Sequence, residues 1–589
     1  MLQFLKYVFA TLVGLFLFFL LGFFILIGIA GSISKEPETT VHANSILKLD
    51  LNRAIDEIAA DNPLKGFNLP GLPSAPTNVG LVQIKEALAN AKLDNNIRGI
   101  FLEANYPVAG YATIEEIRDA LLDFKKSGKF IVSYGEVYSE KGYYLSSIAD
   151  KIYLNTAGGM ELNGLSSAYT FFKGTLDKLE IKPEIFKVGE YKSAVEPFIR
   201  EDMSEPSREQ TKSFLSSINN YTFQNIAKAR GLQVADLKNI ADSLLVQKPS
   251  DALKYKLVTD LGYFDEVESA IRKLLKVSED EEINYLTLSK YNKAAKTVQG
   301  SNSDNRIAVI IASGEIRSGN GDKDIIGSDK MAAEIRKARL DKKIKAVVLR
   351  INSPGGSAMA SDVMWREVML TQKVKPIIAS MSDVAASGGY YMAMGCDKIV
   401  AHPNTITGSI GIFGMLFNVE NFLKNKLGVT VDGVKTNNFA DFPNVNREMT
   451  AFERRVIQRS VEQGYEIFTA KAAQGRHMTQ DELKKLASGR VWSGAEAKEN
   501  GLVDELGGLE DAVRLAAKTA KLKTNDYKVR YYPAPQTFLE EFLSEMSDEN
   551  EARTLRNQLG MLAPYAKSII KLQQMEGIQT RMPFDIDLK

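Results

Sequence analysis

A serine and a lysine, 195 positions apart (387 minus 192), form a pair that could carry out acyl transfer. Ser387 lies in the segment Ala-Ala-Ser-Gly-Gly-Tyr-Tyr, and Lys192 lies in Gly-Glu-Tyr-Lys-Ser-Ala. A serine hydroxyl is a poor nucleophile at neutral pH and needs a base, which is usually histidine but can be a neutral lysine. Burial must then lower the pKa of the lysine by several units, at about 1.4 kcal/mol per unit. Glu190 and Glu196 would oppose this shift if they approached the amine.

The pairing is suggested by an internal duplication with a spacing of 247 residues (344 minus 97). Two short segments show it: residues 97–102 recur as 344–349, and Gly-Tyr-Tyr at 142–144 recurs at 389–391. In this register Ser387 falls opposite Glu140, and Lys192 falls opposite Phe439. Each copy keeps one member of the pair and lacks the other. A working site would therefore form between copies, either within one chain, which we favour, or between neighbouring chains.

A glycine turn could supply the hydrogen-bond donors that acyl transfer also needs. Residues 353–357 read Ser-Pro-Gly-Gly-Ser and lie between a predicted strand and a predicted helix. There Gly355 and Gly356 can present backbone N–H groups to an oxyanion, and Gly388 can add another. The first-copy segment 106–110 lacks both glycines at that place. A Gly-Gly turn alone is weak support, since most are simply turns.

Three other serines compete for the role of nucleophile. Ser353 and Ser357 flank the glycine turn and could only cap the next helix. Ser193 follows Lys192 directly and could be a bystander. Ser387 therefore needs support beyond its neighbours in sequence.

Composition excludes several other classes of function. The formal net charge of +1 argues against nucleic-acid binding, for which a basic footprint is expected. Histidine and cysteine are scarce: His42, His402, His477 and Cys396. This argues against a histidine triad and a zinc site, and a single cysteine excludes an intrachain disulfide. We expect no metal and no cofactor.

Short apolar runs alternate with amphipathic stretches in each copy. In the second copy, residues 346–351 and 376–380 are predicted strands, and residues 360–373 are a predicted helix between them. This order indicates a right-handed parallel crossover and an α/β fold. Ser387 falls just after a strand, where such sheets place their sites.

The duplication also divides the chain into domains. We expect repeat domains at residues 45–300, which supplies the lysine, and 306–523, which supplies the serine, joined by a polar linker at 301–305. Residues 524–589 are expected to form a C-terminal helical extension. Its segment 538–562 is predicted to be an amphipathic helix that docks onto a neighbouring domain or subunit.

The amino terminus predicts a membrane anchor at residues 1–34. Val8–Ala30 is a run of 23 residues without charge. As a helix it would rise roughly 34 Å, enough to cross a hydrocarbon layer of about 30 Å. Its length favours an uncleaved anchor over a signal peptide. Lys6 precedes it, a thin positive bias for a cytoplasmic N-terminus, so the rest of the chain is expected on the other side of the membrane.

Together these features resemble the signal peptide peptidase A (protease IV) family. Four segments carry the resemblance: residues 191–194, 352–356, 384–391 and 407–411, the last reading Thr-Gly-Ser-Ile-Gly. The duplication and the leading apolar segment are similar to the long bacterial form. The resemblance implies two tandem copies of a Clp/crotonase-like βαβ domain after one transmembrane helix. It also implies a homotetramer in the bacterial inner membrane, with catalytic domains on the periplasmic side.

The resemblance further implies a serine endopeptidase that needs no cofactor. Ser387 would be the nucleophile, Lys192 the general base, and Ser409 the residue that orients the lysine. The implied oxyanion-hole donors are glycine amides: Gly355 and Gly356, with Gly388 as a further donor. Implied substrates are short apolar peptides, notably remnants of cleaved signal peptides.

Two alternatives remain open from the sequence. A crotonase-like enzyme acting on acyl-CoA would also use glycine amides, but it predicts a carboxylate pair near the glycine turn and a cytosolic location. A non-catalytic membrane scaffold would keep the fold while its site decayed, as Glu140 shows for the first copy. Against the scaffold, the two losses are complementary. Cleavage-site preference and oligomer number are left open.

Overall fold

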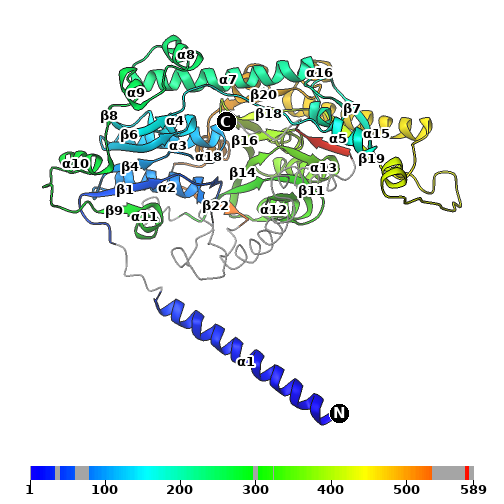
Figure 1. Ribbon diagram of the computed structural model, residues 1–589, viewed down its shortest axis with the longest axis horizontal. Helices are drawn as coiled ribbons and strands as arrows, with labels where there is room; N and C mark the ends of the chain where they lie inside the picture. The colour runs from blue at the N-terminus through cyan, green and yellow to red at the C-terminus, as the bar shows by residue number, and fades with distance from the viewer. Residues whose placement is uncertain are drawn as a thin grey trace.

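Two parallel β-sheets with the same strand order form the body of the protein (Figure 1). The computed structural model describes residues 2–33, 40–59, 78–295, 303–322, 324–524, 526–533 and 578–582. The first sheet has the order β8-β6-β5-β4-β1-β9, and the second repeats it as β21-β17-β16-β14-β10-β22. The duplication predicted from the sequence is therefore present in the fold.

The strands of the first sheet are β1 (Ser45–Asp50), β4 (Ile97–Glu103), β5 (Phe130–Tyr138), β6 (Lys151–Met160), β8 (Asp260–Leu261) and β9 (Tyr285–Thr287). Those of the second are β10 (Arg306–Ser313), β14 (Ile344–Ser353), β16 (Ile377–Ala386), β17 (Lys398–Ala401), β21 (Glu505–Leu506) and β22 (Lys528–Tyr532). Strand β18 (Ile406–Gly408) also pairs with β16, and β20 (Val491–Ser493) pairs antiparallel with β18. Strand β22 pairs with β10 as β9 pairs with β1, so the second copy continues past the predicted boundary at residue 523.

Helices cover both faces of each sheet, which explains the apolar strands. In β14, residues 346–349 are fully buried, as expected for a strand covered on two sides. The helices of the first copy are α2 (Leu81–Leu93), α3 (Tyr111–Lys125), α4 (Glu140–Ser146), α5 (Lys173–Leu179), α6 (Glu196–Ile199), α7 (Glu205–Arg230), α8 (Val234–Asp242), α9 (Pro249–Lys254), α10 (Phe264–Leu275) and α11 (Leu288–Ala294). Those of the second are α12 (Ser328–Leu340), α13 (Ala358–Gln372), α14 (Gly388–Ala393), α15 (Ala451–Arg476), α16 (Gln480–Leu486), α17 (Gly494–Glu499) and α18 (Leu509–Thr519).

A third sheet joins the two copies and the C-terminal segment. Its seven strands run in the order β12 (Gly321–Asp322), β13 (Ile325–Gly327), β11 (Glu315–Arg317), β15 (Gly355–Ser357), β23 (Ile578–Arg581), β19 (Ile412–Asn418) and β7 (Lys182–Val188). Strand β7 belongs to the first copy and pairs antiparallel with β19 of the second. A separate pair, β2 (Ile55–Asp56) and β3 (Val79–Gly80), lies in the first copy.

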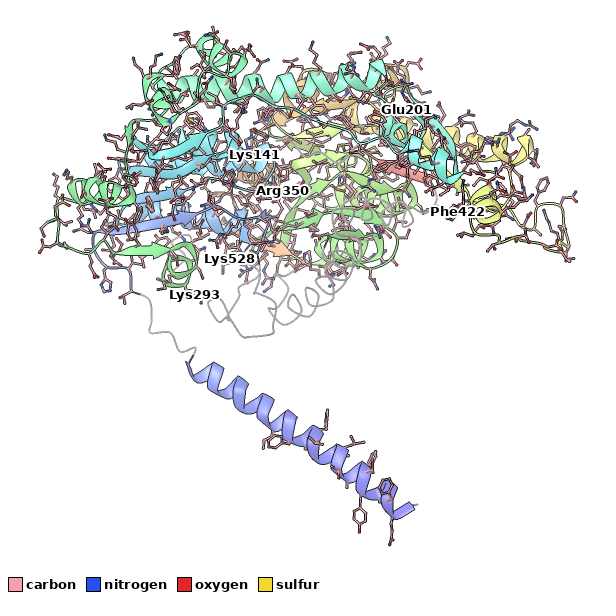
Figure 2. The ribbon with its side chains drawn as sticks, in the orientation of Figure 1. Lys141, Glu201, Lys293, Arg350, Phe422 and Lys528 are labelled. Atoms are coloured by element: carbon pink, nitrogen blue, oxygen red, sulfur yellow. The ribbon has the colours of Figure 1, made fainter. Side chains whose placement is uncertain are left out.

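Buried charges connect the two copies. Arg350, on β14, lies between the two sheets in Figure 2 and is fully buried. Its guanidinium contacts Glu57 at 2.9 Å and Glu116 at 2.7 Å, both from the first copy. Helix α7 also crosses from the first sheet to the second, where it packs on β20 (Figure 1). The two copies therefore form one continuous body.

The two ends of the chain bear on the remaining predictions. Helix α1 (Leu2–Ile33) includes the uncharged run Val8–Ala30. Within the described residues, no helix has both the length and the apolar character that a membrane span requires. The anchor stays a prediction.

The described parts of the C-terminal extension include strands β22 and β23 and no helix. The predicted helix at 538–562 lies outside the described residues.

Candidate active site

Ser387 occupies a strained turn between β16 and α14. Strand β16 ends at Ala386, and α14 begins at Gly388. The backbone of Ser387 has φ 56° and ψ −109°, a conformation that residues other than glycine rarely adopt. Its N–H donates to the carbonyl of Gly408 at 2.8 Å, which anchors the turn to β18. Such strain is often stored at functional sites, and here it fixes where the hydroxyl points.

The β7–β19 ladder brings Lys192 from the first copy to the second. Seven pairs join these strands, from Lys182 opposite Asn418 to Val188 opposite Ile412. The chain then turns at Gly189, whose φ is 97°, and reaches Lys192 three residues later. The Tyr191 N–H donates to the carbonyl of Ser488 at 3.1 Å, which ties this turn to the second copy.

The amine of Lys192 lies within hydrogen-bonding distance of both predicted serines. Its Nζ is 2.9 Å from Ser387 Oγ, 3.0 Å from Ser409 Oγ and 3.1 Å from the Ser409 carbonyl oxygen. All three residues are fully buried. The structure thus brings together, within one chain, three residues that the sequence separates by up to 217 positions.

Burial lowers the pKa of the Lys192 amine well below its usual range. Desolvation is the cause of this shift, and no carboxylate among the described residues counteracts it. The carboxylate of Glu196, which could have opposed the shift, instead accepts from the N–H and hydroxyl of Ser204. An amine in this environment is neutral over a wider pH range than a solvated one.

A neutral amine matches the three contacts one to one. It has two N–H donors and one lone pair. The Ser409 carbonyl can only accept, so it takes one N–H, and Ser409 Oγ can take the second. The lone pair is then directed at the remaining contact, the Ser387 hydroxyl. In this assignment Ser387 donates to Lys192, which is the arrangement that a general base requires.

Two glycines leave space for the lysine: Gly489, which the sequence analysis missed, and Gly411, which lies in segment 407–411 but was given no role there. A Cβ at Gly489 would lie 2.7 Å from the backbone N of Lys192, and a Cβ at Gly411 would lie 3.2 Å from its Cδ. Gln210 was also missed. Its amide donates to the Tyr191 carbonyl at 3.0 Å and accepts from the Val491 N–H at 3.0 Å. Isolated glycines and one glutamine carry no signal of this role in a single sequence.

The glycine turn at residues 353–357 lies next to Ser387. A Cβ at Gly355, whose φ is 99°, would lie 2.7 Å from the Gly388 backbone N, so these two residues are adjacent. Gly388 is the first residue of α14, where the N–H has no partner inside the helix. Gly356 is paired within the third sheet with Ile316 on one side and Thr580 on the other. Gly355 belongs to the same strand, β15, where it pairs with Arg581, and it also lies next to Gly388.

The competing residues have structural contacts. The Ser357 side chain caps α13 by accepting from the Ala360 N–H at 3.3 Å. Ser353 Oγ accepts from the Gly355 N–H at 3.2 Å, and Ser193 Oγ accepts from Gln210 at 2.9 Å. Among the described residues, no group of three or more His, Cys, Asp and Glu side chains is placed to hold a metal ion.

Comparison with known proteins gives the family. The model of "Peptidase family S49" matches twice, at residues 123–278 and 369–523. "Protease 4" of Salmonella typhi is 37% identical over 544 residues, which cover 90% of this chain and 87% of that protein. The chain belongs to peptidase family S49. The resemblance to the signal peptide peptidase A (protease IV) family is thereby confirmed.

Other relatives include a plant enzyme and a solved structure. "Serine protease SPPA, chloroplastic" of Arabidopsis thaliana is 33% identical over 558 residues, which cover 93% of this chain and 78% of that protein. A solved structure of a ClpP1 mutant from Listeria monocytogenes is 14% identical, with a TM-score of 0.24, and covers 35% of this chain and 94% of that one. The two S49 matches divide the site between them. Lys192 lies in the first match, whereas Ser387 and Ser409 lie in the second.

In the first S49 copy, a glutamate, Glu140, stands at the position that corresponds to Ser387. Glu140 begins α4, and one of its carboxylate oxygens accepts from the N–H groups of Asn163 at 3.0 Å and Gly164 at 2.9 Å. Burial raises the pKa of this carboxyl. In the second copy, Phe439 stands opposite Lys192 in the repeat and is 49% exposed. Glu140 and Phe439 thus stand at the positions that the sequence register pairs with Ser387 and Lys192.

Proposed function

We propose that this protein is a serine peptidase in which Ser387 is the nucleophile and Lys192 is the general base. One observation carries the proposal. The amine of a fully buried lysine lies 2.9 Å from the hydroxyl of a serine held in a strained turn. Membership of peptidase family S49 supports the same reaction class.

The reaction follows from the contacts. Lys192 Nζ takes the Ser387 proton as Oγ attacks the peptide carbonyl carbon, and the carbonyl oxygen becomes an oxyanion. The Gly388 N–H, which has no partner inside α14, is the proposed donor for this oxyanion. The Gly355 N–H donates to Ser353 Oγ in this structure and must release that contact to add a second donor. The protonated amine then donates its proton to the leaving nitrogen, and the acyl-serine is hydrolysed by water with Lys192 again acting as base. Throughout, Ser409 holds the amine through its carbonyl and its hydroxyl.

The proposed substrates are short apolar peptides, in particular remnants of cleaved signal peptides. In this proposal the enzyme is anchored by Val8–Ala30 in the bacterial inner membrane, with its N-terminus in the cytoplasm and both copies on the periplasmic side. It assembles as a homotetramer. Tethering to the membrane would raise the effective concentration of peptides released there. The names of the relatives, "Protease 4" and "Serine protease SPPA", support a peptide substrate.

The alternative functions fit the site less well. A crotonase-like acyl-CoA enzyme calls for a carboxylate pair at the glycine turn. The residue beside Gly355 and Gly388 is instead a serine in contact with a lysine. A buried lysine without a counter-charge lowers the stability of the fold. A non-catalytic scaffold would gain nothing in return for this loss, so the buried lysine favours an enzyme.

Labelling with a fluorophosphonate tests the nucleophile directly. The full chain in detergent is treated with the probe, digested and mapped by mass spectrometry. We expect one adduct, on Ser387, and none in Ser387→Ala or Lys192→Ala. Ser193→Ala, which removes the serine next to the lysine, should keep the adduct. An adduct on another serine, or equal labelling of Lys192→Ala, would refute the proposed pair.

A further inference from the structure

The C-terminal strand β23 fills a slot directly beside the proposed active site. Strand β23 (Ile578–Arg581), the red arrow in Figure 1, lies between β15 and β19 and runs antiparallel to both. Its partners on β15 are the glycine-turn residues themselves, since Arg581 is opposite Gly355 and Thr580 is opposite Gly356. Without β23, the facing edges of β15 and β19 would be open for one extended strand.

Thr580 stands against both glycines proposed for the oxyanion hole. A Cβ at Gly355 would lie 2.1 Å from the Thr580 carbonyl oxygen, and a Cβ at Gly388 would lie 3.0 Å from its hydroxyl. The Thr580 hydroxyl donates to the Gly356 carbonyl at 3.1 Å. A peptide substrate that approaches Ser387 needs the space in front of these glycines, so it cannot bind there while Thr580 is in place.

Arg581 and Met582, which follow Thr580, also contact the rest of the protein. The Met582 N–H donates to the Pro354 carbonyl at 2.6 Å, and the Met582 side chain is 3% exposed. That side chain packs in a cluster built from both copies: Tyr111, Phe214, Ile218, Ala386, Ile406 and Val491. Arg581, on the opposite face of the strand, lies 3.5 Å from the carboxylate of Glu315. Main-chain pairing, an apolar pocket and a charge contact therefore all retain this segment.

We propose that the C-terminal strand is an internal inhibitor that occupies the peptide groove of the enzyme. Added strands of this kind bind through main-chain hydrogen bonds, with pockets for alternate side chains, which is how an extended peptide substrate would bind in the same slot. The proposal rests on the proposed peptidase function. Substrate must displace β23, so the strand raises KM and leaves the chemical step unchanged.

The size of the effect follows from tethering. A segment attached to the same chain has an effective concentration on the order of 1 mM. An occupant that binds with a Kd of roughly 10–100 μM would then raise the apparent KM about 10- to 100-fold. Deleting residues 578–589 should lower KM by this factor with kcat unchanged within about twofold.

A point substitution keeps the test independent of the deletion. Met582→Asp places a carboxylate in the apolar cluster and should dislodge the strand, which would lower KM as the deletion does. Met582→Leu fills the same pocket and should behave like the original chain. Intact mass confirms that the tail is present in each full-length preparation, and far-UV circular dichroism confirms the fold.

A peptide added in trans completes the experiment. A synthetic peptide of residues 576–584, Glu-Gly-Ile-Gln-Thr-Arg-Met-Pro-Phe, should inhibit the truncated enzyme competitively, and the same peptide with aspartate for methionine should not. Equal KM in the full chain, the deletion and Met582→Asp, with all three active, would overturn the inhibitor and leave the peptidase intact. Absence of hydrolysis and of fluorophosphonate labelling in all three would instead overturn the proposed function.

Discussion

Replacing Lys192 by methionine separates the energetic cost of the buried amine from its use in catalysis. In the unfolded chain this amine has its ordinary pKa and holds a proton at neutral pH, whereas burial lowers the pKa in the folded protein. Unfolding therefore takes up a proton. The free energy of unfolding then rises with pH, by about 1.4 kcal/mol per unit, between the lowered pKa and the ordinary one.

The variant lacks this slope because methionine does not titrate. At each pH between the lowered pKa and the ordinary one, the original protein should gain stability relative to Lys192→Met, by about 1.4 kcal/mol per pH unit. Loss of the contacts to Ser387 and Ser409 adds an offset of roughly 1–3 kcal/mol, but this offset does not depend on pH. The slope of the difference therefore isolates the proton, whatever the offset is.

Urea unfolding followed by tryptophan fluorescence measures this difference. The chain has two tryptophans, Trp365 and Trp492, and both lie in the second copy, so the signal reports on the copy that surrounds the amine. Lys342→Met, at an exposed lysine, is the matched control and should show no slope. Parallel stability curves for Lys192→Met and the original protein would mean that the folded amine keeps its proton. It could then not serve as a base, and the proposed mechanism would fail.

Three further predictions concern the same site and its support. Ser387→Ala should lower kcat/KM for a fluorogenic peptide by at least about 10³-fold with an unchanged circular dichroism spectrum; substantial remaining activity would exclude the serine. Ser409→Ala removes the hydroxyl contact to the Lys192 amine and keeps the carbonyl contact, so kcat/KM should fall only about 2- to 10-fold. A complete loss of activity would show that the carbonyl contact alone does not hold the amine. Arg350→Met leaves the carboxylates of Glu57 and Glu116 buried without their guanidinium, so the free energy of urea unfolding should fall by about 3–5 kcal/mol. A change under about 1 kcal/mol would show that Arg350 does not hold the copies together.

The fold of each copy was predictable because its signals are local. Strands β5 and β16 begin 247 residues apart (377 minus 130), as do β4 and β14 (344 minus 97). Continuous apolar runs give buried strands, and the repeat fixes which strand corresponds to which. The position of Ser387 just after β16 follows from the same pattern.

The approach of Lys192 to Ser387 was not predictable in this way. It depends on β7 pairing with β19, strands that lie in different copies and start 230 residues apart (412 minus 182). No periodicity specifies a partner at that distance. The duplication suggested the pair and the family resemblance assigned its roles. The structure adds the contacts that hold it, such as Gln210 and the two glycines at positions 411 and 489.

The C-terminal extension shows another limit of local pattern. The helix at 538–562 stays a prediction, and the described parts of the extension include strands β22 and β23. Each of these strands pairs with strands far away in sequence, β22 with β10 and β23 with β15 and β19. The preference of a short segment for strand geometry comes from its partners, so it is invisible until those partners are placed.

A site split between two copies places a demand on the contact between them. Keeping an amine neutral and dry lowers the stability of the fold, and a loose junction would relieve that strain by letting water reach Lys192. Three sets of contacts hold the two copies together. They are the β7–β19 ladder, the ion pairs of Arg350, and the hydrogen bonds of Asp383, whose carboxylate accepts from the N–H and hydroxyl of Thr113 in the first copy. If Ser387 and Lys192 act as proposed, each copy depends on the other for its chemistry, and the complementary loss of serine and lysine is tolerable only with such a junction.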